Sequence, residues 1–247
     1  MRKLRLIWRL LYFTVYTTRI VGEIWLRNSL QGRDLQRAMR IRRKWANKVL
    51  YKVGVRIEEE GVIPQGKGLL VGNHRSYLDP IILLRKVDAW PVAKAEIATW
   101  PMIGAGAAMA GILYLRREDA GHRAKVLGMI RQTIDSGYPV ILFPEGNTCD
   151  VPDKTLPFLT GGFRLAAKYG IEITPIAFFY PDPRDFWVGE VSFLAHAWQS
   201  FGRNEIRVKV CYGPTMRDTD GDALLVAAHA WIENKLHALV SAQKTPA

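Results

Sequence analysis

Residues 69–80, LLVGNHRSYLDP, join a short apolar run to a polar turn and then to the start of a helix. The run at 69–71 has the length and composition of a buried strand. Pro80 suits the beginning of a helix, because its missing N–H has no helical partner there. Similar apolar runs alternate with helical stretches along the rest of the chain, and this alternation indicates an α/β fold.

The predicted fold is a mixed, mostly parallel central sheet flanked by helices, formed by one domain at 55–247 and preceded by a helical segment at 1–54. Strands are expected at 55–58, 69–71, 90–93, 112–115, 140–143, 173–179 and 207–211. Helices are expected at 80–85, 100–110, 120–136, 162–169 and 221–242.

The net charge of +12 is concentrated near the N-terminus. Residues 1–56 contain fifteen Lys and Arg and two acids, whereas the other 191 residues contain 20 basic and 21 acidic residues. A basic segment of this kind suits nucleic acid or an anionic membrane. Cys149 and Cys211 form no metal-binding spacing, and no other cluster of metal ligands is visible. We therefore expect a reduced cytosolic protein without a metal site.

Two helices are predicted at 4–27 and 33–53, with a turn at Gln31 and Gly32. The longest uncharged run, 10–18, is far shorter than the roughly 20 residues of a spanning helix. In the first helix most charges share an arc of about 100°, and the remaining surface is apolar and aromatic. This pattern favours a hairpin that docks on anionic lipid. Ordinary core-facing helices with solvated charges are the alternative; nucleic acid is disfavoured, because the apolar surface would have no partner.

His74 and Asp79 flank the turn that follows the strand at 69–71. If the turn folds back, Asp79 can accept a hydrogen bond from one imidazole nitrogen and leave the other nitrogen free to take a proton. Asp79 is also a natural N-cap for the helix beginning near Pro80, so a capping residue beside an unrelated histidine is an equal alternative. Two other strand ends carry polar groups, Glu145 with Gly146 after 140–143 and Arg116 with Arg117 after 112–115.

The motif NHRSYLD at 73–79 resembles the N-H-x-x-x-x-D box of the PlsC-like glycerolipid and lysophospholipid acyltransferases. Residues 111–117 are similar to the second motif of that family, which places Arg117 on the motif arginine. FPEG at 143–146 matches the third motif, and ITPIA at 173–177 resembles the fourth. The order and spacing agree over roughly residues 50–215.

The resemblance implies transfer of a fatty acyl chain from acyl-carrier protein or acyl-CoA to the hydroxyl of 1-acyl-glycerol-3-phosphate. His74 would be the general base and Asp79 its orienter, with no covalent acyl-enzyme and no cofactor beyond the co-substrate. The implied acceptor-binding residues are Asn73, Lys94, Arg117, Glu145 and Gly146. The implied partners are the anionic membrane surface, the lyso-lipid and the thioester donor, at the cytoplasmic face of the inner membrane.

Two departures from the family pattern leave the acceptor open. The third motif commonly continues with an arginine where this chain has Thr148, and a later lysine is replaced by Leu159. Both missing charges suit a phosphate, so a lyso-ornithine lipid is the alternative acceptor. A non-catalytic membrane lipid-binding protein is the alternative of another class.

Overall fold

The computed structural model describes residues 2–100, 102–116, 118–189 and 191–244. The α-helices are α1 (Arg2–Gln31), α2 (Leu35–Val53), α3 (Leu78–Leu84), α4 (Ile103–Ala110), α5 (Ala120–Asp135), α6 (Gly161–Tyr169), α7 (Phe193–Ser200) and α8 (Gly221–Lys244), with short 3₁₀ helices η1 (Ala95–Thr99) and η2 (Pro183–Asp185). The strands are β1 (Val55–Glu60), β2 (Leu69–Gly72), β3 (Trp90–Lys94), β4 (Leu113–Leu115), β5 (Val140–Leu142), β6 (Ile173–Phe179) and β7 (Ile206–Tyr212).

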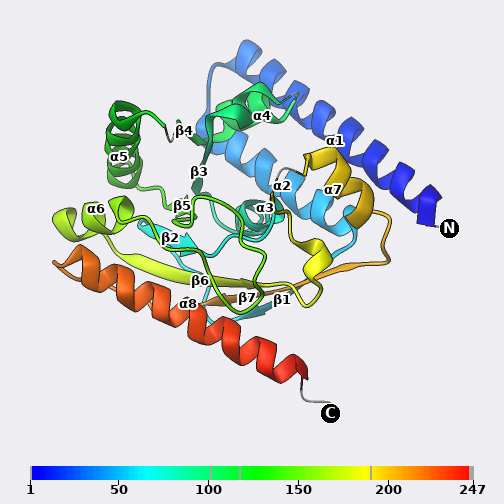
Figure 1. Cartoon of the computed structure of the whole chain (residues 1–247). Coiled ribbons are helices and arrows are strands. Elements are labelled where there is room, and N and C mark those ends of the chain that lie inside the picture. Colours follow the sequence, from blue (N-terminus) through cyan, green and yellow to red (C-terminus); the bar gives the residue numbers. More distant parts are fainter. Residues whose placement is uncertain (1, 101, 117, 190, 245–247) are drawn as a thin grey trace.

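Within these residues, seven strands form one sheet in the order β1-β7-β6-β2-β5-β3-β4 (Figure 1). Every neighbouring pair is parallel except β6 and β7, which are antiparallel. The predicted mixed, mostly parallel sheet is therefore confirmed. Connections through helices are what parallel neighbours require.

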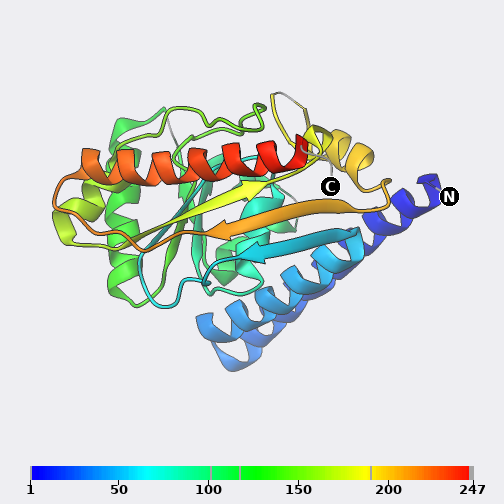
Figure 2. The ribbon, with the colours of Figure 1, turned by 90° about the horizontal axis from the view of Figure 1, so that it is seen from below.

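Alternate residues of the central strands pack into different cores on the two faces of the sheet. Leu69 and Val71 of β2 join the core beneath α5, α6 and α8, whereas Leu70 joins the core beneath α2 and α3. Because both faces are covered, the strands consist of nearly continuous apolar runs. Figure 2 shows α8 on one side of the sheet and the α1–α2 pair on the other.

The N-terminal helices pack side by side and share the main core. Phe13 of α1 and Val49, Leu50 and Val53 of α2 belong to the same buried cluster as the sheet. The division into domains at residue 54 stays an expectation. None of the helices in the described ranges has the length and apolar character needed to cross a membrane.

Two arginines of α1 and α2 are buried and do not face outward. Arg9 is 7 % exposed and donates to the carbonyl groups of Phe201, Arg203 and Asn204. Arg42 is equally buried and donates to carbonyl groups at the ends of α4 and of the loop before β3. Burial lowers the pKa of Arg42 to about 10, so it stays charged at neutral pH.

The outward face of α1 is instead largely apolar. Leu11 is 60 % exposed and Trp25 is 62 % exposed. The further exposed apolar residues of α1 are Leu4, Ile7, Trp8, Val15, Leu26 and Leu30. The nearby cations Lys48 and Lys52 of α2 lie over the rings of Tyr16 and Trp8.

Two helical regions differ from expectation. The helix predicted at 100–110 begins only at Ile103, since Met102 has φ +63°, in the left-handed region that interrupts a helix. Helix α7 was not predicted, although the hydroxyl of Ser192 caps it by accepting from the N–H of Ala195.

Candidate functional site

The site lies at the carboxyl edge of the sheet. β2, β5 and β6 are neighbouring parallel strands, so their carboxyl ends meet at one edge. His74 follows β2, Glu145 follows β5 and Tyr180 follows β6. Strand order thus brings together three polar side chains that are up to 106 positions apart in the sequence.

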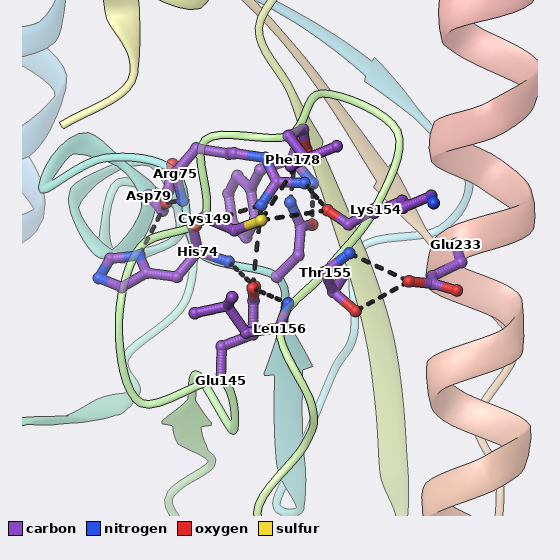
Figure 3. A network of polar contacts seen from close by, with 12 residues as sticks. His74, Arg75, Asp79, Glu145, Cys149, Lys154, Thr155, Leu156, Phe178 and Glu233 are labelled. Atoms are coloured by element: carbon purple, nitrogen blue, oxygen red, sulfur yellow. Dashed lines mark hydrogen bonds and ion pairs between the residues drawn. The ribbon is translucent and has the colours of Figure 1, made fainter. Parts of the chain in front are cut away.

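His74 and Asp79 are in direct contact. The Nδ1 atom of His74 lies 2.9 Å from Oδ2 of Asp79, and the Asp79 side chain is completely buried. Figure 3 shows the second ring nitrogen of His74 pointing away from Asp79. The imidazole also stacks on the ring of Phe143, with the ring centroids 4.3 Å apart. Ring orientation is therefore set by one hydrogen bond and one aromatic face.

Four donors surround the carboxylate of Asp79. Oδ2 accepts from the backbone N–H groups of Arg75 (2.7 Å) and Ser76 (2.8 Å) as well as from His74, and Oδ1 accepts from the hydroxyl of Tyr180 (2.6 Å). Because an ionised carboxylate can only accept, Nδ1 of His74 carries its proton and Nε2 holds the free lone pair. This is the tautomer that a general base needs.

The alternative role of Asp79, as the N-cap of the helix, is wrong. Helix α3 begins at Leu78 with Tyr77 at the cap position, and Asp79 lies inside the first turn. Its carboxylate turns back onto the N–H groups of Arg75 and Ser76, which precede the helix. The side chain of Asp79 thus closes the turn that runs from His74 to Asp79.

Glu145 is buried beside this turn and accepts two backbone hydrogen bonds. Oε1 accepts from the N–H of His74 (2.6 Å) and Oε2 from the N–H of Leu156 (2.7 Å). Burial raises the pKa of Glu145, and those two bonds with the nearby charge of Arg75 oppose the rise. The geometry gives Glu145 a positioning role toward His74; contact with a substrate stays a prediction.

Arg75 is a buried residue that the sequence did not single out. It is 1 % exposed, donates to the carbonyl group of Lys154, and lies 3.9 Å from Oε2 of Glu145. Its guanidinium also lies over the ring of Phe186. Arg75 provides the positive charge beside the Glu145 carboxylate, a role that only the folded turn reveals.

The other candidate residues divide between the cleft wall and the protein interior. Lys94 and Gly146 line the same cleft as His74. Asn73 is fully buried, and its amide both donates to and accepts from the backbone of Phe178. This placement gives Asn73 the task of joining β2 to β6. Arg117, the expected motif arginine, lies outside the described residues.

The cleft has a volume of about 1250 Å³ and is lined mostly by apolar side chains. Phe13 and Ile20 of α1, and Ile103 of α4, form part of its wall. Thr148 and Leu159, which replace the two expected cations, both line it as well. Within the described part of the chain, no group of three His, Cys, Asp or Glu side chains is placed to hold a metal ion.

Comparisons with known proteins identify the family of the chain. A family model described as Acyltransferase matches residues 54–179. A 1-acyl-sn-glycerol-3-phosphate acyltransferase from Helicobacter pylori is 31% identical over 125 residues, which cover 50% of this chain and only 53% of that relative. A lyso-ornithine lipid O-acyltransferase from Brucella abortus is 27% identical over 209 residues, or 76% of each chain.

A solved structure shares the fold over nearly its whole length. The crystal structure of the 1-acyl-sn-glycerophosphate acyltransferase PlsC from Thermotoga maritima aligns with a TM-score of 0.72 and 21% identity, covering 97% of this chain and 98% of that one. The family model covers just over half of the sequence and includes His74, Asp79 and Glu145. The resemblance inferred from the four motifs is thus confirmed, and the chain belongs to the acyltransferase family of enzymes.

Proposed function

We propose that the protein transfers a fatty acyl chain from a thioester donor to the hydroxyl of a lyso-lipid at a membrane surface. The observation that carries the proposal is the buried Asp79 holding His74 on the wall of an apolar cleft. An apolar cleft of this size suits a lipid chain. The donor is the thioester of acyl-carrier protein or of coenzyme A.

Nε2 of His74 accepts the proton of the acceptor hydroxyl as its oxygen attacks the thioester carbonyl carbon. The carbon–sulfur bond breaks, and the leaving thiolate takes the proton back from the imidazolium. Asp79 stabilises the positive ring between these two steps, and the bond from Tyr180 keeps Asp79 in place. No acyl group is attached to the protein.

The preferred acceptor is 1-acyl-glycerol-3-phosphate, which would yield phosphatidic acid. Lys94 supports this choice, because it lines the cleft and is exposed. Thr148 favours the second candidate, lyso-ornithine lipid, since it stands where an arginine would bind phosphate. The relative from Brucella abortus, which covers more of the chain, supports the same alternative.

Membrane docking belongs to the same proposal. The exposed apolar face of α1, beside Lys48 and Lys52, has the composition of a helix lying in the interface of an anionic bilayer. The cleft is walled in part by the opposite side of α1, so a lipid would travel only a short path from the bilayer to His74. We place the protein peripherally, at the cytoplasmic face of the inner membrane.

An acceptor panel tests the proposal. Purified wild-type protein and the His74→Gln variant receive one acyl-thioester and either lysophosphatidate or lyso-ornithine lipid. We expect transfer by the wild type and a loss of about 10²–10⁴-fold in the variant. A folded variant with wild-type rates would contradict the role of His74 as general base. Faster transfer to lyso-ornithine lipid would change the acceptor, and lipid binding without any transfer would identify a non-catalytic lipid-binding protein.

A further inference from the structure

The 149–156 segment, from Cys149 to Leu156, connects the candidate active site to α8. It contains no helix or strand, so its backbone N–H groups depend on side chains and loops for partners. Figure 3 shows it running between the His74–Asp79 turn and α8. Two consecutive N–H groups of the segment point to carboxylates on its opposite sides: that of Thr155 to Glu233 and that of Leu156 to Glu145.

On the active-site side, three contacts fix the segment to Glu145 and to the His74–Asp79 turn. The N–H of Leu156 donates to Oε2 of Glu145 (2.7 Å), and the N–H of Cys149 donates to the carbonyl group of His74 (3.0 Å). Arg75 donates to the carbonyl group of Lys154. A shift of the segment would therefore move Glu145 and, through it, the backbone of His74.

On the other side, Glu233 of α8 holds Thr155. Oε1 of Glu233 accepts from the N–H of Thr155 (3.0 Å) and from its hydroxyl (3.1 Å). Nε2 of His229, one helical turn earlier, lies 2.8 Å from the same hydroxyl. Glu233 is partly exposed, whereas its neighbour Ile232 is buried in the core and anchors α8 to the sheet.

A continuous path runs from Glu233 to His74: hydrogen bonds join Glu233 to Thr155, Leu156 to Glu145 and Glu145 to His74, and the peptide bond joins Thr155 to Leu156. Hydrogen bonds to a carboxylate are about twice as strong as neutral ones. The bonds from the N–H groups of Thr155 and Leu156 are both of this kind. A catalytic side chain needs its supporting groups held to within roughly 0.5 Å. α8 is a rigid element that can provide such support.

We propose that Glu233 is a positioning residue for His74, acting through Thr155, Leu156 and Glu145. The expected effect of Glu233 on the rate of catalysis rests on the proposed acyl transfer, whereas its expected effect on the backbone around His74 does not. Glu233→Ala removes the acceptor without disturbing the buried face of α8. Glu233→Gln keeps one acceptor oxygen, and Asp222→Ala removes the other acid of α8, whose side chain pairs with the exposed Arg164.

Hydrogen exchange followed by mass spectrometry tests the structural link in the full-length protein. In Glu233→Ala we expect about tenfold faster amide exchange in peptides covering 150–157 and also in those covering 73–78, because loss of the outer bond frees both. Glu233→Gln should restore most of the protection. Asp222→Ala should exchange like the wild type. Acceleration confined to 150–157 would overturn the proposal. If Glu233→Ala does not fold, Glu233→Asp decides the question: its carboxylate is one methylene group shorter, so it should lose the bond to the N–H of Thr155 and accelerate exchange in the same two regions.

Steady-state kinetics tests the catalytic link. We expect Glu233→Ala to lower kcat about tenfold with KM for the lyso-lipid nearly unchanged, since a displaced base affects the chemical step. An unchanged kcat beside faster exchange at 73–78 would overturn the positioning role. If the wild-type protein transfers no acyl chain, the proposed function fails, and exchange at 73–78 still decides whether Glu233 positions His74.

Discussion

The hydroxyl of Tyr180 donates a 2.6 Å hydrogen bond to Oδ1 of Asp79, and both residues are almost completely buried. Burial, followed by the charge of Asp79, raises the pKa of Tyr180 well above its usual value. Tyr180 therefore remains a neutral donor across the working range of pH. It satisfies the carboxylate oxygen that His74 does not reach.

Replacing Tyr180 by Phe should weaken both stability and activity. The change leaves Oδ1 of Asp79 buried without a partner, which costs about 1–3 kcal/mol of the free energy of unfolding. We expect kcat to fall about tenfold, because Asp79 then holds the imidazole less firmly. Denaturant unfolding and steady-state kinetics measure the two effects.

Tyr212→Phe is the matched control. Tyr212 is also buried and donates a 2.7 Å hydrogen bond to a carboxylate, that of Glu59, away from the candidate site. The Tyr212→Phe variant should be less stable than the wild type but have the same kcat. Equal losses of kcat in the two variants would contradict the specific role of Tyr180.

Asp185 predicts a pH dependence of stability. It is 1 % exposed, and burial raises its pKa to about 6 despite the ion pair with Arg203. A raised carboxyl pKa means that the ionised form is disfavoured in the folded state, so stability is lost as the pH rises through about 6. Relative to Asp185→Asn, the wild type should gain about 1 kcal/mol between pH 7 and pH 5.

Urea unfolding of both proteins at a series of pH values measures this gain. Asp119→Asn is the control, because the hydrogen bond from the backbone N–H of His122 lowers the pKa of Asp119. Its stability difference from the wild type should stay flat between pH 7 and pH 5. A flat difference for Asp185→Asn as well would refute the assignment.

The strands and the central pair of the site were predictable from local sequence. Apolar runs identify strands because burial on both faces requires them, and the turn motif placed His74 close to Asp79. Tyr180 follows a predicted strand too, but nothing local indicates that β6 lies beside β2. The contact of Tyr180 with Asp79 depends on strand order, which the folded sheet alone reveals.

The arginines of the N-terminal helices show a different limit. Helical periodicity groups residues by face but does not say which face meets the protein. Arg9 lies on the face that packs inward, and carbonyl groups at 201–204 accept its hydrogen bonds. Loop carbonyl groups leave no trace in the pattern of side chains, so the burial of Arg9 was not predictable, whereas Arg42 lies on the apolar face of its predicted helix.

Thr148 predicts how the choice of acceptor can be altered. It lines the cleft where the family motif commonly has an arginine. Thr148→Arg adds a guanidinium suited to a phosphate. We expect the ratio of kcat/KM for lysophosphatidate to that for lyso-ornithine lipid to rise about tenfold, a difference of roughly 1.4 kcal/mol. Thr148→Gln, which adds a longer polar side chain without a charge, should leave the ratio unchanged. An unchanged ratio in the arginine variant would show that this position does not contact the head group.

The outward face of α1 predicts dependence on an anionic membrane. Ile7 and Leu11 lie one turn apart and are both more than half exposed. Replacing both by Glu removes apolar surface worth about 1.5–3 kcal/mol per side chain when buried in lipid, and adds charge that anionic lipid repels. We expect at least about tenfold weaker binding to anionic vesicles in a sedimentation assay, and unchanged transfer to a short-chain, water-soluble lyso-lipid. Val62→Glu with Val226→Glu is the control, since both valines are exposed outside α1. Equal loss of vesicle binding in the two double variants would show that α1 is not the docking surface.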